Sequence, residues 1–120
     1  MGGYGALLAA ERAASLFSAV TVASPALWLS PGATAPGAFD NAADYHANDV
    51  FASVASLRPL TVRVDCGTGD PFYASSRHFV AEMTFPHVAS FGPGFHDDAY
   101  WRSVAPAQIR TIAARLSNAH

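Results

Sequence analysis

The chain has 120 residues, a formal net charge of −2 and a hydrophobic content of 51%, which are typical of one globular unit and exclude a disordered or fibrous protein. Its seven basic residues are all arginines that stand singly, so neither a nucleic-acid-binding patch nor a polybasic membrane surface is predicted. Cys66 is the only cysteine, which excludes an intrachain disulfide and a Cys-x-x-Cys metal site. The apolar run Ala6–Ala10 is short and follows no basic segment, so no signal peptide or membrane span is predicted and the localisation stays unknown.

The first third of the chain predicts a helix and then a strand. Small residues on one side and Leu7 and Leu8 on another predict a helix over residues 3–14. The β-branched run Ala19–Ala23 predicts a buried strand.

A less regular segment follows over residues 29–59, which we expect to be a loop and short-helix excursion between strands. Residues 29–39 are rich in Pro, Gly and Ala and predict a loop. Asn48 is a candidate cap for a short helix over residues 49–57.

The second half of the chain predicts two more strands, each followed by a helix. Leu60–Cys66 alternates between apolar and polar positions and predicts the clearest strand in the chain. A helix is expected after it, with Asp70 as its N-cap and Pro71 in its first turn, and residues 87–91 predict a third short strand.

The last element is expected to begin near Asp97 and to be interrupted by Pro106. It resumes with an apolar face at helical spacing, made of Ile109, Ile112, Ala113 and Leu116. Strands that alternate with helices predict an α/β fold with a parallel sheet covered on both sides, formed by residues 1–120 as a single unit.

Three stretches resemble the active-site motifs of α/β-hydrolases. The start, MGGYGALLAA, is similar to the residues that follow the serine in the strand-turn-helix motif G-x-S-x-G. VRVDCGTGDPFY resembles the turn that carries the acid, at Asp70, and FGPGFHDDAYW resembles the loop that carries the histidine, at His96. The chain therefore resembles the C-terminal half of an enzyme of the putative-esterase group, which includes esterase D and the mycobacterial mycolyltransferases.

The resemblance implies a partial α/β-hydrolase fold with three mostly parallel strands, and hydrolysis or acyl transfer of a small ester through a serine acyl-enzyme. Asp70 would orient the imidazole, His96 would be the general base, and the Met1 backbone nitrogen would be half of the oxyanion hole. On this alignment the serine stands immediately before Met1, so the sequence is expected to be truncated just after the nucleophile and to be inactive as given. No metal and no cofactor are implied.

Other interpretations of these residues stay open. Asp70 also suits a pure helix cap, and His96 a simple loop position. Ser24 follows a strand but is followed by proline where the motif needs glycine, and Cys66 is more typical of a core thiol than of a nucleophile. The remaining histidines lack metal-ligand spacing: His46, His78, His87 and His120. Five aromatic residues suit either an apolar acyl site or the core: Trp28, Phe72, Tyr73, Tyr100 and Trp101.

A second function class is a non-catalytic fragment or remnant that pairs with another chain. If the strand that precedes the first helix in the family is absent, the strand Ala19–Ala23 has an unpaired edge that favours self-association. Leu7 and Leu8 would then be partly exposed.

Overall fold

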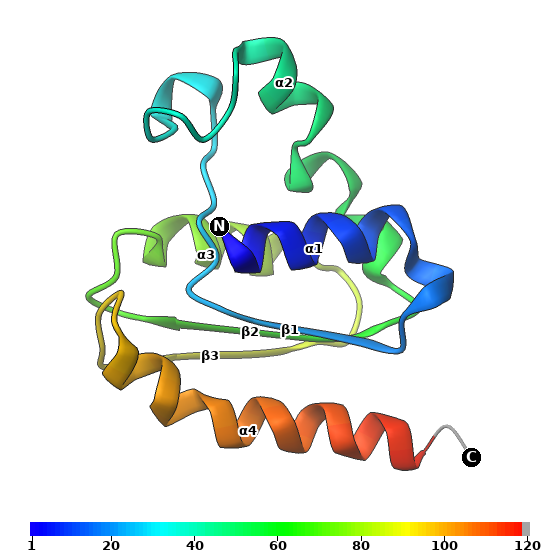
Figure 1. The fold of residues 1–120 in the computed structure, drawn as a ribbon. Helices are drawn as coiled ribbons and strands as arrows, with labels where there is room; N and C mark the ends of the chain where they lie inside the picture. Colours follow the sequence, from blue (N-terminus) through cyan, green and yellow to red (C-terminus); the bar gives the residue numbers. More distant parts are fainter. Residues whose placement is uncertain (119–120) are drawn as a thin grey trace.

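The computed structural model describes residues 1–118 and shows an α/β fold built on one three-stranded parallel sheet (Figure 1). The strand order is β1-β2-β3, and both pairs are parallel, which confirms the predicted fold class. The strands are β1 (Ala19–Ala23), β2 (Thr61–Gly67) and β3 (Val88–Gly92). Helices α1 (Gly2–Arg12) and α3 (Tyr73–Glu82) lie on one side of the sheet and α4 (Asp98–Ser117) lies on the other.

The excursion between β1 and β2 contains more helix than its sequence predicts. It forms the 3₁₀ helices η2 (Pro31–Ala33) and η3 (Val50–Leu57) and the short helix α2 (Ala42–Ala47), which was not predicted. The prediction that Asn48 caps the helical segment over residues 49–57 is wrong, because Asn48 ends α2. The Asp49 carboxylate caps η3 instead by accepting the Phe51 N–H at 2.9 Å. The Asn41 side chain caps α2 by accepting the Asp44 N–H at 2.8 Å.

The main hydrophobic core lies between the sheet and the layer formed by α1, η3 and α3. Alternation in β2 sends Val62 and Val64 into this core, where they are 1% and 0% exposed. Leu7 on α1 is also completely buried, so the expectation that it would be partly exposed is wrong. The reason is that η3 folds over α1 and supplies the cover that the sheet alone would not give.

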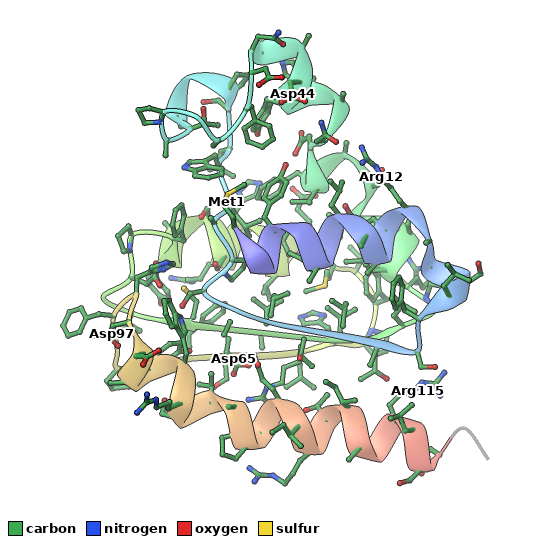
Figure 2. All side chains as sticks on the ribbon, in the orientation of Figure 1. Met1, Arg12, Asp44, Asp65, Asp97 and Arg115 are labelled. Carbon is green, nitrogen blue, oxygen red and sulfur yellow. The ribbon has the colours of Figure 1, made fainter. Side chains whose placement is uncertain are left out.

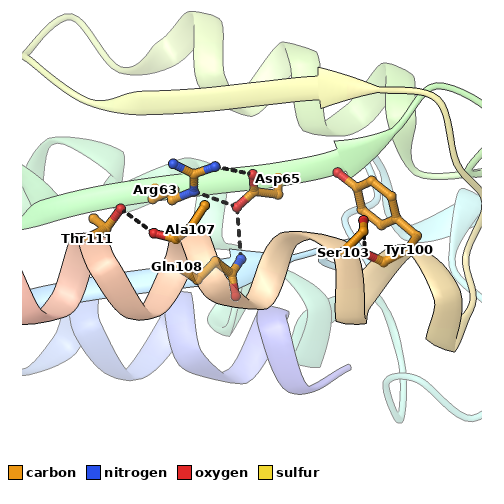
Figure 3. Close-up of polar contacts among 7 residues, drawn as sticks. All are labelled: Arg63, Asp65, Tyr100, Ser103, Ala107, Gln108 and Thr111. Carbon is orange, nitrogen blue, oxygen red and sulfur yellow. Dashed lines mark hydrogen bonds and ion pairs between the residues drawn. The ribbon is translucent and has the colours of Figure 1, made fainter.

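The opposite face of β2 is polar and is covered by α4. Asp65 is fully buried there and forms two 2.8 Å contacts with the Arg63 guanidinium (Figure 3). The Gln108 side chain on α4 donates to the same carboxylate at 2.9 Å. This cluster fixes α4 against the sheet.

Helix α4 is continuous through Pro106, so the predicted interruption is wrong. An interior proline removes one backbone donor and crowds the carbonyl four residues earlier, which costs about 3 kcal/mol, so other contacts of the helix have to offset this cost. Here Gln108 contacts Asp65, and the Arg115 Nε donates to the Ser18 carbonyl at 3.3 Å. The predicted apolar face is largely exposed, since Ile109 and Leu116 are 65% and 53% exposed. His120 falls outside the described residues.

Candidate functional site

The candidate acid lies on the turn between β2 and α3, at the carboxyl end of the sheet. The Asp70 side chain is fully buried, and its Oδ1 accepts the Phe72 N–H at 2.8 Å. Helix α3 begins at Tyr73 with Phe72 as its N-cap, so the predictions of an Asp70 cap and of Pro71 in the first turn are wrong. Asp70 instead stabilises the turn that leads into the helix, and its second oxygen is left for another partner.

The candidate base lies on the loop between β3 and α4. Asp97 caps α4 by accepting the Tyr100 N–H at 3.0 Å, which fixes the end of this loop. Gly94 has a φ of +153°, and a Cβ there would lie 2.4 Å from the Tyr100 ring, so only glycine fits. The chain can therefore turn closely over the start of α4 and place His96 beside the end of β2.

His96 and Asp70, which are 26 positions apart in sequence, meet directly. The His96 Nδ1 lies 2.9 Å from the Asp70 Oδ2. The His96 ring packs edge-to-face against Phe72 and Trp101, at centroid distances of 5.6 and 5.2 Å. Its side chain is 38% exposed, and its Nε2 makes no hydrogen bond within residues 1–118. A proton on Nδ1 that faces the carboxylate leaves the lone pair on Nε2, which is the nitrogen that can accept a proton from a substrate or nucleophile.

Backbone contacts hold the acid and base loops together. The N–H groups of Thr68 and Gly69 donate to the carbonyls of Gly92 and Gly94 at 2.8 and 2.9 Å. A Cβ at Gly67 would lie 2.4 Å from the Gly94 oxygen, so the two chains touch at a distance that only glycine allows. The role of Gly67 was not predicted, although the run CGTGD is a visible signal of a close turn.

Met1 lies at the N-terminus of α1, above the sheet, where backbone N–H groups have no partner within the helix (Figure 2). It is 56% exposed, and its carbonyl accepts the Gly5 N–H at 2.9 Å. A Cβ at Gly3 would lie 3.0 Å from the Pro25 Cα, so the first turn of α1 packs closely on the chain that leaves β1. This close approach is the role that glycines have in a strand-turn-helix motif.

Neither alternative nucleophile has the environment that its chemistry needs. Ser24 has a φ of +50°, but it is 4% exposed and its Oγ is buried without a partner in the described part of the chain. Burial raises the pKa of the Cys66 thiol to about 11, so the reactive thiolate is disfavoured. Both residues are therefore parts of the interior.

Among residues 1–118, three further histidines lie apart from one another and from the site. His46 packs edge-to-face on Tyr45, and the His78 Nε2 lies 3.2 Å from Glu82 on the next turn of α3. The His87 Nδ1 contacts the Phe85 carbonyl at 2.8 Å. Among residues 1–118 no three His, Cys, Asp or Glu side chains are grouped closely enough to hold a metal ion. The same residues contain no helix with the length and apolarity needed to cross a membrane.

The sequence did not decide which of the five aromatic residues line a site and which fill the core, and the structure gives them different surroundings. Trp28 and Phe72 lie with their ring centroids 5.5 Å apart, and Trp101 contacts His96. Tyr73 packs on Phe91, and Tyr100 is buried beneath the histidine loop.

A protein-family model described as Putative esterase matches residues 1–110. No curated protein matches the chain significantly. Among solved structures, a ferulic acid esterase is similar, with a TM-score of 0.75 and 24% identity over 94% of this chain and 49% of its own. S-formylglutathione hydrolase (FrmB) from Staphylococcus aureus has a TM-score of 0.68 and 21% identity over 93% of this chain and 48% of its own.

Fluorophosphonate-binding serine hydrolase F (FphF) of Staphylococcus aureus, in a substrate-bound structure, is also similar. Its TM-score is 0.71, with 18% identity over 92% of this chain and 51% of its own. At these identities the likeness shows a common fold. The chain spans about half the length of these three structures.

Proposed function

Because the chain belongs to the Putative esterase family, whose model matches residues 1–110, we propose that it carries the acid and the base of a serine carboxylic-ester hydrolase or acyltransferase. The observation that supports this most directly is the 2.9 Å contact between the Asp70 Oδ2 and the His96 Nδ1. A buried carboxylate that fixes an imidazole by one nitrogen and leaves the other nitrogen accessible is the arrangement that general base catalysis requires. The acyl group and the acceptor stay undefined beyond a small ester or acyl substrate.

Each residue has one role in the proposed reaction. The His96 Nε2 removes the proton from the serine hydroxyl as its oxygen attacks the ester carbonyl, and later returns that proton to the leaving alcohol. Asp70 orients the ring and stabilises the imidazolium. The Met1 nitrogen, as a peptide N–H at the start of α1, donates to the oxyanion, where the helix dipole also favours negative charge. This chemistry needs neither a metal nor an organic cofactor.

The nucleophile is proposed to be a serine immediately before Met1, outside the 120 residues. The close packing of Gly3 on Pro25 supports this placement, because it brings the start of α1 tightly onto the sheet as the motif requires. The Met1 nitrogen becomes a peptide N–H only when a residue precedes it. The 120-residue chain is accordingly proposed to be inactive.

The test uses two proteins. The 120-residue chain is incubated with 4-nitrophenyl acetate and a fluorophosphonate probe, and neither turnover nor labelling is expected. A protein extended before Met1 by a strand that ends in Gly-x-Ser should be labelled on that serine. In it, His96→Ala should lower kcat by about four orders of magnitude. Labelling of the short chain that Ser24→Ala removes, or an extended protein that is fully active without His96, would refute the proposal.

A second candidate function, a non-catalytic fragment that pairs with another chain, is favoured by the edge of β1 that no strand pairs within residues 1–118. An apolar groove of about 260 Å³ lies beside this edge, between α1 and α4. Phe17 and Ile112 line it and are 44% and 37% exposed. Unpaired strand edges and exposed apolar grooves favour association.

Sedimentation velocity over a concentration series tests this second candidate. The chain should form dimers or larger species, and Ile112→Arg, which places a charge in the groove, should shift it towards monomer. Ala43→Arg on the exposed side of α2 is the matched control and should change nothing. A monomer at all concentrations would refute pairing between copies through this edge.

A further inference from the structure

A buried carboxylate that the proposed reaction does not use lies near the C-terminal end of α1. Glu11 is 7% exposed, and both of its carboxylate oxygens are buried without a hydrogen-bond partner within residues 1–118. Helix α1 runs from the carboxyl end of the sheet back to its amino end, so Glu11 lies at the end of the helix remote from Met1 (Figure 1). Buried polar groups are nearly always hydrogen-bonded, so this carboxylate indicates a partner from outside the chain.

A small hollow lies beside Glu11, between α1 and the segment that joins α2 to η3. Its volume is about 160 Å³, below the roughly 300–1,000 Å³ of sites for drug-sized ligands. Its wall is mainly polar and includes the side chains of Glu11, His46 and Asp49. The hollow therefore suits a guest of only a few atoms that forms hydrogen bonds.

Two carboxylates next to the hollow favour a cationic guest. Asp49 uses its Oδ1 to accept the Phe51 N–H at 2.9 Å, and its Oδ2 accepts no hydrogen bond within residues 1–118. Burial, with the Asp49 charge adding to it, raises the pKa of Glu11 to about 8, as expected of a carboxylate that has no counter-ion. A bound cation would interact with both side chains.

Arg12 also lines the hollow, but its charge is directed to α2 instead. Its Nη2 donates to the Ala47 carbonyl and to the Asn48 Oδ1, both at 2.8 Å. The other titratable side chains around the carboxylate are Tyr4 on α1 and His46 on α2, and neither carries a permanent positive charge. The position of a counter-ion beside the two carboxylates is therefore open to a guest.

An ammonium group suits this position better than a metal ion. Within the described part of the chain, no three His, Cys, Asp or Glu side chains are placed to hold a metal ion. A primary ammonium has three N–H donors, and its hydrogen bonds to carboxylates are among the strong ones. We propose that the hollow binds a small primary amine in its ammonium form, held by Glu11 and Asp49. This site goes beyond ester chemistry and does not depend on the roles of Asp70 and His96.

The probe is methylammonium chloride, titrated into the ¹³C,¹⁵N-labelled 120-residue chain while the Glu11 carboxyl carbon and the backbone amides are followed by NMR. Saturable shifts are expected at Glu11, Asp49 and Ala52. Tetramethylammonium chloride, which has the same charge but no N–H donor, and potassium chloride should give none. Because the ammonium binds the ionised carboxylate, whose pKa is about 8, the apparent affinity at pH 9 should exceed that at pH 7 about tenfold.

Two variants locate the site. Glu11→Gln should remove the pH dependence and weaken binding at pH 9 at least about tenfold. Asp49→Asn keeps an oxygen that can cap η3 and should weaken binding at least about threefold. Glu82→Gln is the matched control and should leave the affinity unchanged, since the Glu82 side chain is 50% exposed and pairs with His78 on α3. Protection of each variant's amides from hydrogen exchange like that of the parent chain shows that it is folded.

The outcomes decide between an ammonium site, a metal site and no site. Absence of saturable shifts with methylammonium, equal affinity for tetramethylammonium, or unchanged binding by Glu11→Gln would overturn the site. Saturable shifts at these residues with calcium chloride, and none with methylammonium, would overturn the ammonium assignment in favour of a metal ion. None of these results bears on the acid and base roles, which are tested by the activity of the extended protein.

Discussion

Replacing Gly67 by alanine should separate the candidate acid from the candidate base. The added Cβ would lie 2.4 Å from the Gly94 oxygen and 2.5 Å from the Gly94 carbonyl carbon, both of them backbone atoms that cannot rotate away. Ordinary contact begins at 3.4 Å, so the two loops must move apart by roughly 1 Å. The 2.9 Å contact between Asp70 and His96 would then open to nearly 4 Å, which is too long for a hydrogen bond.

The magnitude follows from two losses. Overpacking of this kind costs about 1–3 kcal/mol, and loss of a hydrogen bond to a charged group costs about 1.5–3 kcal/mol. If the loops move apart, the overpacking is relieved but the hydrogen bond is lost, so the two costs do not add in full. We therefore expect Gly67→Ala to lower the free energy of unfolding by about 2–3 kcal/mol. Gly92→Ala is the matched control, because Gly92 is the register partner of Gly67 and a Cβ there has no atom within 4 Å.

Two measurements on the 120-residue chain check this prediction. Urea unfolding gives the change in stability. Proton NMR at low temperature should show the shared Nδ1 proton of His96 at low field in the parent chain and in Gly92→Ala, and not in Gly67→Ala. If Gly67→Ala keeps both this resonance and the unfolding midpoint, the contact between the two loops does not set the geometry of the pair. Equal loss in both variants would show that the effect is general to the strand ends.

Two further predictions concern buried charge. Burial, with the Asp49 carboxylate adding to it, raises the pKa of Glu11 from 4.5 to about 8, so the folded chain binds a proton that the unfolded chain has released. The contribution of Glu11 to the free energy of unfolding is therefore complete below pH 4.5 and falls by about 1.4 kcal/mol per pH unit up to pH 8. Glu11→Gln should remove this slope when urea unfolding is measured at several pH values. Parallel pH profiles of the parent chain and Glu11→Gln would contradict the prediction. Asp65→Asn should lower the free energy of unfolding by about 3–5 kcal/mol, because it leaves the Arg63 charge uncompensated. Asp98→Asn, in an exposed ion pair, is the control and should lower it by about 0–1 kcal/mol. Similar losses in the two variants would refute the distinction between the buried and the exposed pair.

Local sequence patterns predicted the strands well. The β-branched run at β1 and the alternation at β2 each reflect one buried face of a sheet, which is a property of neighbouring residues. The order of elements then fixed the parallel topology. The position of Asp70 and His96 after two adjacent strands followed from the family resemblance, and the structure brings these residues into contact.

What the sequence did not predict depends on contacts between distant segments. Pro106 was expected to interrupt a helix, but beyond it Gln108 binds Asp65 on β2 and Arg115 binds the Ser18 carbonyl just before β1, and α4 is continuous. Leu7 was expected to be partly exposed to solvent, but η3, which lies 43 or more positions later in the chain, packs over α1 and buries it. The run CGTGD marks a close turn after Gly67, but the sequence does not show that the histidine loop approaches Gly67 and leaves no room for a side chain there.

The contacts that hold the candidate acid and base together are separate from the exposed apolar surface of the chain. The acid and base come from the β2–α3 and β3–α4 connections, whose backbones bond to each other. Phe72, just before α3, and Trp101 on α4 pack on the imidazole. The exposed apolar side chains of Met1, Phe17 and Ile112 lie instead at the start of α1 and along the free edge of β1. The Asp70–His96 geometry is therefore maintained by contacts internal to residues 1–118 and can be measured on the chain alone. The proposed serine differs in this respect, because its test needs a protein extended at the start of α1.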